Sequence, residues 1–420
     1  MRILHLSTFH TTGGAGIAAR RLNEALVRNG LDSQLLVPQT DRPEPQVTGL
    51  AETPLQRKTA LARFALDRLS FWLHERDKTV RFAFSPARVG SDLSRHPLVQ
   101  QADVLHLHWT QFGFLSLDGM RKLFSLGKPV VWTLHDMWAF TGGCHYSGTC
   151  ERYRTHCQHC PFLRRPAEHD LSYRVFERKK AVFANVPLTF VTPSRWLSDL
   201  LKTSALAGGF PVEVLPNPID TKRFQPSPDR ADIRRQLNLP VDRRLLLFGS
   251  FNTADPRKGF RYVQEALRKA KNNLPDTELM VFGKTGPETD AALPLPVHSL
   301  GSVSSEEQMI RIYQAADAFV IPSLEDNFPN TVIESLACGT PVVGFATGGI
   351  PEQITHLRTG YLAEPKSSDD LAAGLIWLLN ETDPAMVRTQ AADSVKPLDY
   401  AVMAERFGSL YRRTGGNGAV

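Results

Sequence analysis

The chain has 420 residues, more than one hydrophobic core usually organises, so we expect two domains. Its 42% hydrophobic and 22% charged residues exclude a disordered chain. A formal charge of +6 suits an anionic substrate or an anionic lipid surface, although surplus arginine on a solvated surface is the simpler explanation. Nothing before Ser7 resembles a signal peptide and no apolar run approaches the ~20 residues of a membrane helix, so we expect a cytoplasmic protein.

Short, β-rich apolar runs alternate with segments of helical periodicity along the chain. The runs predict strands at residues 3–7, 34–37, 104–108, 130–134, 188–192, 212–215, 245–248, 278–282, 318–321 and 341–345. Helices are predicted at residues 16–29, 259–271, 305–315 and 369–379. Nearly continuous apolar strands that alternate with helices indicate parallel sheets covered by helices on both faces.

The polar, proline-rich stretch 216–242 is the expected domain junction. We therefore expect an α/β protein of two Rossmann-like, doubly wound domains, residues 1–215 and 216–395, followed by a C-terminal helix and tail, residues 396–420. Ligands of such sheets bind outside the carboxyl ends of the strands, so the active site is expected in a cleft where the two domains face each other.

The loop after the first strand contains Gly13 and Gly14 and leads into a helix. Glycine lets the backbone approach a ligand, and a helix N-terminus offers free N–H groups to an anion. The spacing does not match the GxGxxG fingerprint, so NAD binding is not supported, and a tight turn explains the loop equally well.

A stronger signal lies at residues 321–343. A strand there leads into a loop that carries Asp326, and the following helix carries Glu334. Carboxylates accept strong hydrogen bonds from hydroxyl groups, so the pair predicts a site for the hydroxyls of a sugar and of a ribose. Alternatively, the two acids are a helix cap and a surface carboxylate. The complete sequence pattern around them, residues 321–343, favours the sugar and ribose site.

The pattern Pro-Ser-x-x-acid-x7-Glu, followed by Ala-x-Gly-x-Pro-Val-Val, at 322–343 resembles the donor-site signature of family-4 glycosyltransferases. Further segments similar to family motifs are 347–352, 359–361, 214–220 with Phe224, and 133–136. The resemblance extends from residue 1 to about residue 380, with the motifs in the family's order. It implies the GT-B fold, with an N-terminal acceptor-side domain and a C-terminal nucleotide-sugar-binding domain.

The resemblance assigns roles residue by residue. Glu334 is expected to hold the donor ribose, and Asp326 to contact the sugar hydroxyls. His135 is expected to lie beside the anomeric centre, and Lys258 to neutralise the leaving diphosphate. The expected donor-binding residues are Gly13, Gly14, Arg257, Lys258, Asn327, Phe328, Asn330, Thr331 and Glu334.

Two positions depart from the family pattern. The family typically has an arginine just after the glycine of the preceding strand, whereas Ser250 follows Gly249 here. We expect Arg257 to supply the missing charge. Asp326 stands where the family usually has glutamate, so its reach is shorter.

The resemblance implies a retaining transferase that moves a sugar from a nucleoside-diphosphate sugar to an acceptor without a protein nucleophile. Fixed cations and helix N-termini stabilise charge on the diphosphate, and the sequence has no Asp-x-Asp motif, so no metal or other cofactor is expected in catalysis. The alternatives are a sugar-nucleotide 2-epimerase of the same fold and a zinc-containing nucleic-acid-binding protein. The donor-site pattern at 322–343 favours a glycosyltransferase over both alternatives, and we expect no nucleic acid as a partner.

The loop 144–160 contains four cysteines, Cys144, Cys150, Cys157 and Cys160. Clustered cysteines in a chain without a secretion signal are more often metal ligands than disulfides, so a structural zinc is the first interpretation. Free thiols or a redox-labile pair are the alternatives. Together with Trp132–Trp138, the spacing resembles the subgroup that contains colanic acid glycosyltransferases, which implies bacterial exopolysaccharide biosynthesis and a lipid-linked saccharide acceptor.

Residues 55–84 interleave large apolar side chains with seven basic ones, Arg57, Lys58, Arg63, Arg68, Arg76, Lys78 and Arg81. A basic amphipathic helix here predicts peripheral contact with an anionic membrane, on the inner face of the cytoplasmic membrane. The solvated face of an ordinary packed helix explains the pattern equally well. Farther along, His108 and Trp109 end a strand and are predicted to line the acceptor pocket, although packing is the commoner role of such residues.

Overall fold

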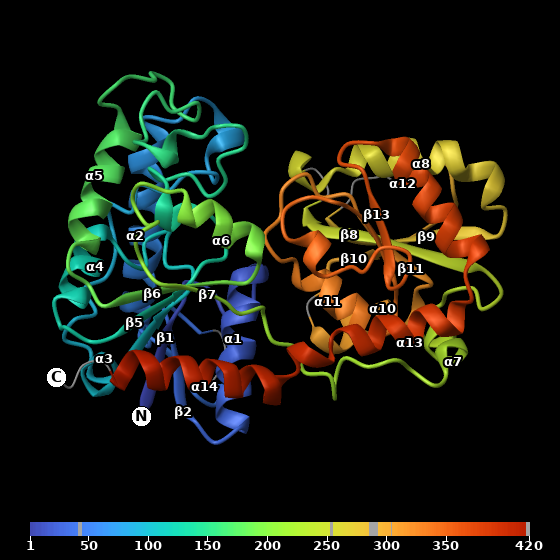
Figure 1. The fold of residues 1–420 in the computed structure, drawn as a ribbon, viewed down its shortest axis with the longest axis horizontal. Coiled ribbons are helices and arrows are strands. Elements are labelled where there is room, and N and C mark those ends of the chain that lie inside the picture. Colours follow the sequence, from blue (N-terminus) through green and yellow to red (C-terminus); the bar gives the residue numbers. More distant parts are fainter. Residues whose placement is uncertain (41–43, 253–254, 285–292, 304, 417–420) are drawn as a thin grey trace. The chain divides into compact units, whose positions relative to one another are not determined.

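The computed structural model describes residues 1–40, 44–252, 255–284, 293–303 and 305–416. The chain forms two compact units, one of Met1–Pro218 with Tyr400–Val420 and one of Ile219–Asp399 (Figure 1). The division therefore falls after Pro218 rather than after residue 215. The expected C-terminal helix is present at Tyr400–Gly416, and it belongs to the first unit rather than forming a separate segment.

The first unit is built on a seven-stranded parallel sheet with the order β3-β2-β1-β4-β5-β6-β7. Its strands are β1 (Arg2–Leu6), β2 (Asp32–Val37), β3 (Val47–Gly49), β4 (Val104–Leu107), β5 (Val130–Thr133), β6 (Leu188–Thr192) and β7 (Val212–Val214). Its α-helices are α1 (Gly13–Arg28), α2 (Pro54–Trp72), α3 (Pro97–Gln101), α4 (Leu117–Phe124), α5 (Leu171–Phe183), α6 (Arg195–Lys202) and α14 (Tyr400–Gly416).

The second unit is built on a six-stranded parallel sheet with the order β10-β9-β8-β11-β12-β13. Its strands are β8 (Arg244–Asn252), β9 (Thr277–Lys284), β10 (Val297–Gly301), β11 (Ala318–Ile321), β12 (Val342–Phe345) and β13 (Gly360–Ala363). Its α-helices are α7 (Arg230–Gln236), α8 (Phe260–Ala270), α10 (Glu306–Ala315), α11 (Asn330–Ala337), α12 (Ser368–Ile376) and α13 (Pro384–Ser394).

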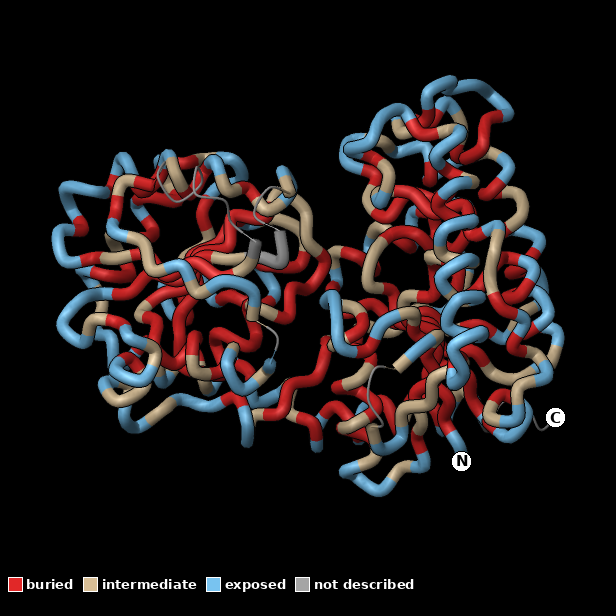
Figure 2. The backbone as a smooth tube through the Cα atoms, turned by 180° about the vertical axis from the view of Figure 1, so that it is seen from behind, coloured by how far each residue is buried: buried red, intermediate tan, exposed pale blue. Residues whose placement is uncertain are grey.

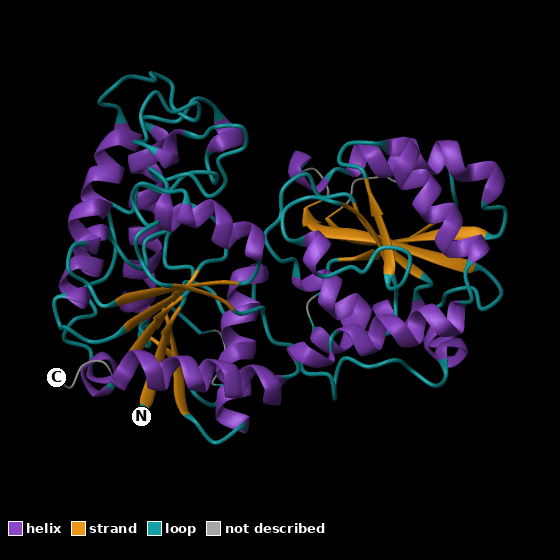
Figure 3. Ribbon diagram, in the orientation of Figure 1, coloured by secondary structure: helices purple, strands orange, loops and turns teal. Residues whose placement is uncertain are grey.

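Each sheet separates two hydrophobic cores, because helices cover both of its faces (Figure 3). On β1, Ile3 packs into the core beneath α1 and α14, whereas Leu4 packs into the core on the opposite face. Buried residues concentrate along the strands of both units (Figure 2). Strands that are buried on both faces consist of continuous apolar residues, so the central strands could be located from the sequence. The prediction of two Rossmann-like α/β domains is confirmed.

Three strands escaped the sequence analysis, and all three lie at sheet edges. They are β3, β10 and β13. An edge strand has a neighbour on one side only, and the residues of β3 are all half-buried. Such strands lack the continuous apolar run that identifies a central strand.

Helix α2 differs from the predicted basic helix. Thr53 and Gln56 form a reciprocal capping box at its start, and the helix ends at Trp72. The last three basic residues of the stretch therefore lie beyond the helix. Arg68 points inward, where it pairs with buried Asp67 at 2.7 Å. Among the described residues, no helix combines the length and the apolar character that crossing a bilayer requires.

Candidate active site

The predicted donor-site residues of the second unit lie on the loops that follow β8 and β11 and on helix α11. The loop after β8 ends in a 3₁₀ turn, Pro256–Lys258, and Gly259 follows it with a φ of +69°. A Cβ at Gly259 would lie 2.0 Å from the carbonyl oxygen of Pro322, so only glycine lets the two loops approach. The Leu324 N–H also donates to the carbonyl oxygen of Arg257, at 2.7 Å.

This approach brings Lys258 and Asp326 together, 68 residues apart in the chain. The Nζ atom of Lys258 lies 2.7 Å from Oδ2 of Asp326, and their side chains remain 33% and 15% exposed. The backbone of Asp326 is held by the loop after β12, because the Gly349 N–H donates to its carbonyl oxygen at 3.1 Å. Gly348 is required beside it, since a Cβ there would lie 1.9 Å from the same oxygen.

Glu334 lies on α11, the helix that follows the Asp326 loop. Its carboxylate is buried and accepts a hydrogen bond from the Tyr313 hydroxyl at 3.0 Å. Asn327, Phe328 and Asn330 are buried and Thr331 is half-buried where the helix begins. Pro329 occupies the N-cap position and supplies no capping side chain, so the helix N-terminus is built like an anion-binding end.

Arg257 has a partner that the sequence analysis did not foresee. Its Nη2 atom lies 2.8 Å from Oδ2 of Asp255, and its Nε atom lies 3.3 Å from Oδ1. Burial raises the pKa of Asp255, but the bonds and charge of Arg257 outweigh it and hold the pKa below its ordinary value. A ligand phosphate must therefore compete with Asp255 for Arg257. The side chain of Ser250 lies outside the described residues.

In the first unit, His135 follows β5. Its Nε2 atom lies 3.2 Å from Nδ1 of His108, and burial lowers the pKa of His135 to about 4. His108 is itself buried, and its other ring nitrogen lies 2.9 Å from Nδ1 of His5. His108 thus supports His135 from inside the domain, which corrects its assignment as a lining residue of the acceptor pocket.

Trp109 is oriented by Asp136. The indole N–H donates to Oδ2 of Asp136 at 2.8 Å, and Nδ1 of His145 lies 2.7 Å from the same oxygen. The indole stacks on Phe9, with 5.6 Å between ring centroids. Trp109 does not line the neighbouring pocket directly but backs Phe9, which does.

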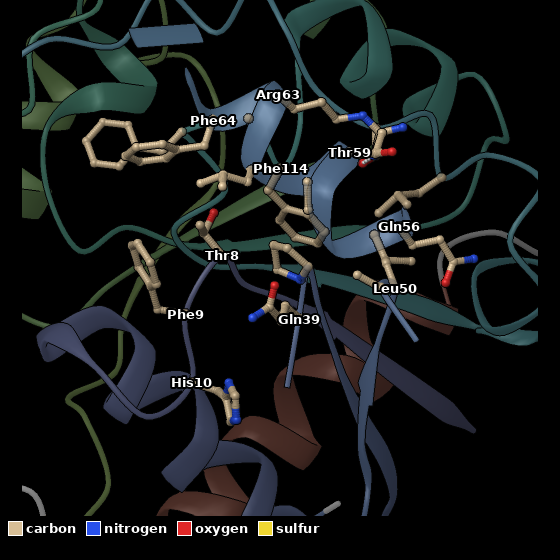
Figure 4. Close-up of a pocket in the computed structure, with 18 of the residues that line it drawn as sticks. Thr8, Phe9, His10, Gln39, Leu50, Gln56, Thr59, Arg63, Phe64 and Phe114 are labelled. Atoms are coloured by element: carbon tan, nitrogen blue, oxygen red, sulfur yellow. Dashed lines mark hydrogen bonds between the residues drawn. The ribbon is translucent and has the colours of Figure 1, made fainter. Parts of the chain in front are cut away.

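The first unit contains a pocket of about 680 Å³ next to the loop that carries Gly13 and Gly14. Its wall combines the β1–α1 loop, one side of α2 and residues 112–114 (Figure 4). The residues labelled in Figure 4 are Thr8, Phe9, His10, Gln39, Leu50, Gln56, Thr59, Arg63, Phe64 and Phe114. Sequence reasoning missed this pocket, because loops from distant parts of the chain assemble it.

Gly13 and Gly14 begin α1, at the carboxyl end of β1. Gly13 has a φ of +70°, and both residues are exposed. Thr12 at the N-cap makes no side-chain cap hydrogen bond. This geometry would allow a ligand to approach the helix N-terminus, and the role of the loop in donor binding stays a prediction.

The four cysteines line one small pocket, and all four are free thiols. The Gly142 N–H donates to Sγ of Cys157 at 3.0 Å. Among the described residues, one group of three or more possible metal ligands has all its ligand atoms within 4.8 Å of one another, and it is His5, His106 and His108. The sulfur atoms of the cysteine cluster are therefore farther apart than this. A closed tetrahedral zinc site would require the loop to contract.

The three histidines themselves are engaged in hydrogen bonds. The ring nitrogens of His106 lie 2.7 Å from the hydroxyls of Tyr411 and Thr133, and those of His108 face His5 and His135. A metal ion there would have to displace these bonds, so we assign the group to hydrogen bonding.

Comparison with known proteins identifies the family of the chain. The model of Glycosyltransferase Family 4 matches residues 12–223, just over half of the chain, and the model of Glycosyl transferases group 1 matches residues 229–394. A glycosyl transferase of Escherichia coli (strain K12) named for colanic acid biosynthesis, WcaC, is 26% identical over 359 residues, 82% of each chain. A D-inositol 3-phosphate glycosyltransferase of Mycobacterium sp. (strain KMS) is 24% identical and covers 91% of this chain and 81% of its own.

Solved structures share the fold over nearly the whole chain. Sucrose-phosphate synthase from Thermosynechococcus elongatus has a TM-score of 0.67 at 20% identity and covers 99% of this chain and 100% of its own. Anabaena HepE in complex with UDP-glucose has a TM-score of 0.64 at 16% identity, covering 98% and 100%. The family models and the curated relatives agree with the donor-site string at 322–343, and the chain is therefore a member of glycosyltransferase family 4.

Proposed function

We propose that the protein is a retaining transferase that moves a sugar from a nucleoside-diphosphate sugar to a saccharide acceptor. The observation that carries the proposal is the contact between Lys258 and Asp326, 2.7 Å apart on loops at the carboxyl edge of the second sheet, with Glu334 on the helix that follows. A cation in contact with one carboxylate, with a second carboxylate on the following helix, combines a partner for a diphosphate with acceptors for sugar hydroxyls.

In this proposal Lys258 and the N-terminus of α11 stabilise the negative charge that grows on the leaving diphosphate. Glu334 accepts hydrogen bonds from the ribose hydroxyls, and Asp326 accepts them from the donor sugar. His135 binds the donor sugar, as the family resemblance implies. The reaction needs no metal ion or other cofactor, because fixed protein charges supply the electrostatic stabilisation.

The pocket of the first unit is the proposed saccharide acceptor site. Phe9, Phe64 and Phe114 give it apolar faces, while Gln39, Gln56 and Arg63 supply hydrogen-bonding groups. This combination of apolar walls with a few polar groups is typical of small-molecule sites. The similarity to a glycosyl transferase named for colanic acid biosynthesis supports a lipid-linked acceptor and a role in bacterial exopolysaccharide biosynthesis.

Membership of a glycosyltransferase family argues against both alternatives, the epimerase and the nucleic-acid-binding protein. The deciding experiment is a thermal-shift screen with UDP, GDP and ADP, followed by a transfer assay with the sugar nucleotide of the best base. We expect one base to stabilise the protein. No stabilisation by any of the three, or conversion of the sugar nucleotide without an acceptor into its epimer, would refute the proposal.

We also propose that α2 docks on an anionic bilayer, on the inner face of the cytoplasmic membrane. The outward side of α2 exposes Leu55, Leu66, Leu69 and Trp72, and Arg57 and Lys58 are exposed on the same helix. Another side of the same helix forms a wall of the acceptor pocket. Apolar side chains with adjacent cations suit an interface of anionic lipid, where a lipid-linked acceptor is displayed.

Liposome flotation tests this docking surface. We expect the protein to float with vesicles of anionic lipid and Leu66→Glu to abolish flotation, because a carboxylate in the apolar stripe repels the anionic surface. Leu357→Glu is the matched control, since Leu357 is 53% exposed in the second unit and Leu66 is 51% exposed. Equal flotation of the two variants, or none by the unmodified protein, would contradict the proposal.

For the cysteine cluster we propose a structural zinc ion that pins the loop 144–160. The cysteines share one pocket, and Lys179 is buried beside them. Burial lowers the pKa of Lys179 to about 7 and raises the pKa of the Cys157 thiol, but the charge of Lys179, where it is protonated, favours the Cys157 thiolate. Four thiolates around zinc carry net negative charge, which a buried cation offsets.

Elemental analysis of protein purified without chelator should find about one zinc per chain, the number that a site of four thiolates binds. We expect Cys157→Ser to lose the metal and to lower the Tm. Cys338→Ser is the control, because Cys338 is buried in the second unit, away from the cluster. Protein without zinc, or a Cys157→Ser variant that retains it, would rule out the site.

A further inference from the structure

Three histidines of the first unit form one hydrogen-bonded chain that ends at His135. The Nδ1 atom of His5, on β1, lies 2.9 Å from Nε2 of His108, which follows β4. The Nδ1 atom of His108 lies 3.2 Å from Nε2 of His135, which follows β5. At the inner end, Nε2 of His5 is buried and has no partner among the described residues.

Burial keeps all three rings neutral near pH 7. It lowers the pKa of His5 to about 3 and that of His135 to about 4, and it lowers the pKa of His108 well below its usual value. A neutral imidazole carries one N–H and one accepting nitrogen. Each of the two hydrogen bonds between rings contains one proton. The tautomer of one ring therefore fixes the tautomers of the other two, and only two arrangements of the three histidines satisfy both bonds.

The two arrangements differ at the ends of the chain. In one, every ring carries its proton on Nδ1, so His5 buries an unpaired lone pair and His135 presents an N–H. In the other, every ring carries its proton on Nε2, so His5 buries an N–H with no acceptor. Orphaned buried N–H groups are the rarer and costlier defect, which favours the first arrangement.

We propose that His108 is a positioning residue which, together with His5, holds His135 in the Nδ1–H tautomer, so that His135 donates a hydrogen bond to an oxygen of the nucleoside-diphosphate sugar. The inference rests on the proposed function for its ligand, whereas the tautomer is a property of the free protein. It predicts that the recognised oxygen acts as an acceptor, either a sugar hydroxyl or a phosphate oxygen.

His106 provides a comparison inside the same stack of rings. Its centroid lies 4.4 Å from that of His108, yet its nitrogens face Tyr411 and Thr133 rather than the chain. Tyr411→Phe removes a buried hydrogen bond of the stack without touching the chain. It is therefore the matched control for a loss of packing or of stability.

The first test measures tautomers by ring ¹⁵N chemical shifts of histidine-labelled protein without any ligand. We expect His5, His108 and His135 each to be protonated on Nδ1 at pH 7, and Tyr411→Phe to leave those shifts in place. Protonation of His135 on Nε2, or a stoichiometric metal ion bound to His5 and His108, overturns the proposal. The measurement does not depend on enzymatic activity, and it needs no substitution of His5, His108 or His135.

The second test measures hydrolysis of the best-binding sugar nucleotide. We expect His108→Leu to release the His135 tautomer and to lower kcat/KM about tenfold, the size of one lost hydrogen bond. The affinity for the free nucleoside diphosphate stays unchanged if the recognised oxygen belongs to the sugar, and weakens if it belongs to the phosphate. His108→Gln should restore most of the activity, because its amide N–H donates to Nε2 of His135. An unchanged tautomer and rate in His108→Leu overturns the proposal. Failure of the proposed function is distinct, since the unmodified protein would then bind no nucleoside diphosphate.

Discussion

Replacing Lys258 by alanine should lower kcat for sugar-nucleotide turnover by about 10²–10³-fold, the usual effect of removing one fixed charge-stabilising donor. The leaving diphosphate gains negative charge in the transition state, and Lys258 is the cation that the structure places beside Asp326. The pair is partly exposed, so its loss should cost less than about 1 kcal/mol of stability and shift the Tm little.

Lys258→Arg and Arg257→Ala are the controls for this result. Arginine preserves the charge and should retain most of kcat. Arg257 is 52% exposed, against 33% for Lys258, and its partner Asp255 belongs to its own turn rather than to the Asp326 loop. We therefore expect its removal to cost about tenfold or less, in contrast to the role of replacement cation that the sequence suggested. If Arg257→Ala lowers kcat as much as Lys258→Ala does, Arg257 is the replacement cation after all. An unchanged kcat in Lys258→Ala would remove Lys258 from the mechanism.

Glu334→Gln should weaken the affinity for the preferred nucleoside diphosphate about 10–100-fold, because a hydrogen bond to a charged group contributes about 1.5–3 kcal/mol. The ribose hydroxyls would then face an amide in place of a carboxylate. Glutamine has the same length and retains an oxygen that accepts from the Tyr313 hydroxyl, so the fold should persist. Isothermal titration calorimetry with the free nucleoside diphosphate measures the change directly.

Glu325→Gln is the matched control, since Glu325 lies in the same loop and has no assigned ligand. We expect its affinity to remain within about threefold of the unmodified protein, as for most substitutions away from a site. Equal affinities of Glu334→Gln and the unmodified protein would place the ribose elsewhere. A parallel loss in Glu325→Gln would attribute the effect to the net charge of the loop.

Much of the fold was predictable because central strands are buried on both faces. The runs at 188–192 and 318–321 became β6 and β11 with the same bounds. The sequence also predicted Asp326 and Glu334 as donor-site acids, since their loop and helix are adjacent along the chain, and this assignment stays a prediction. The edge strands β3, β10 and β13, the return of Tyr400 to the first unit and the choice of which side of α2 faces outward were not predictable, because they depend on which neighbour covers each surface.

The amino-acid sequence by itself determined the parallel α/β class, the two domains and the family, and it predicted the acids of a donor site. Only the tertiary structure decided that Asp255 pairs with Arg257, that His108 supports His135 from within, and which segments wall the pocket of the first unit. The reason is physical. Periodicity and burial on two faces leave a local signature in the chain, whereas a hydrogen bond such as that between His106 and Tyr411, 305 residues apart, depends on how distant elements pack.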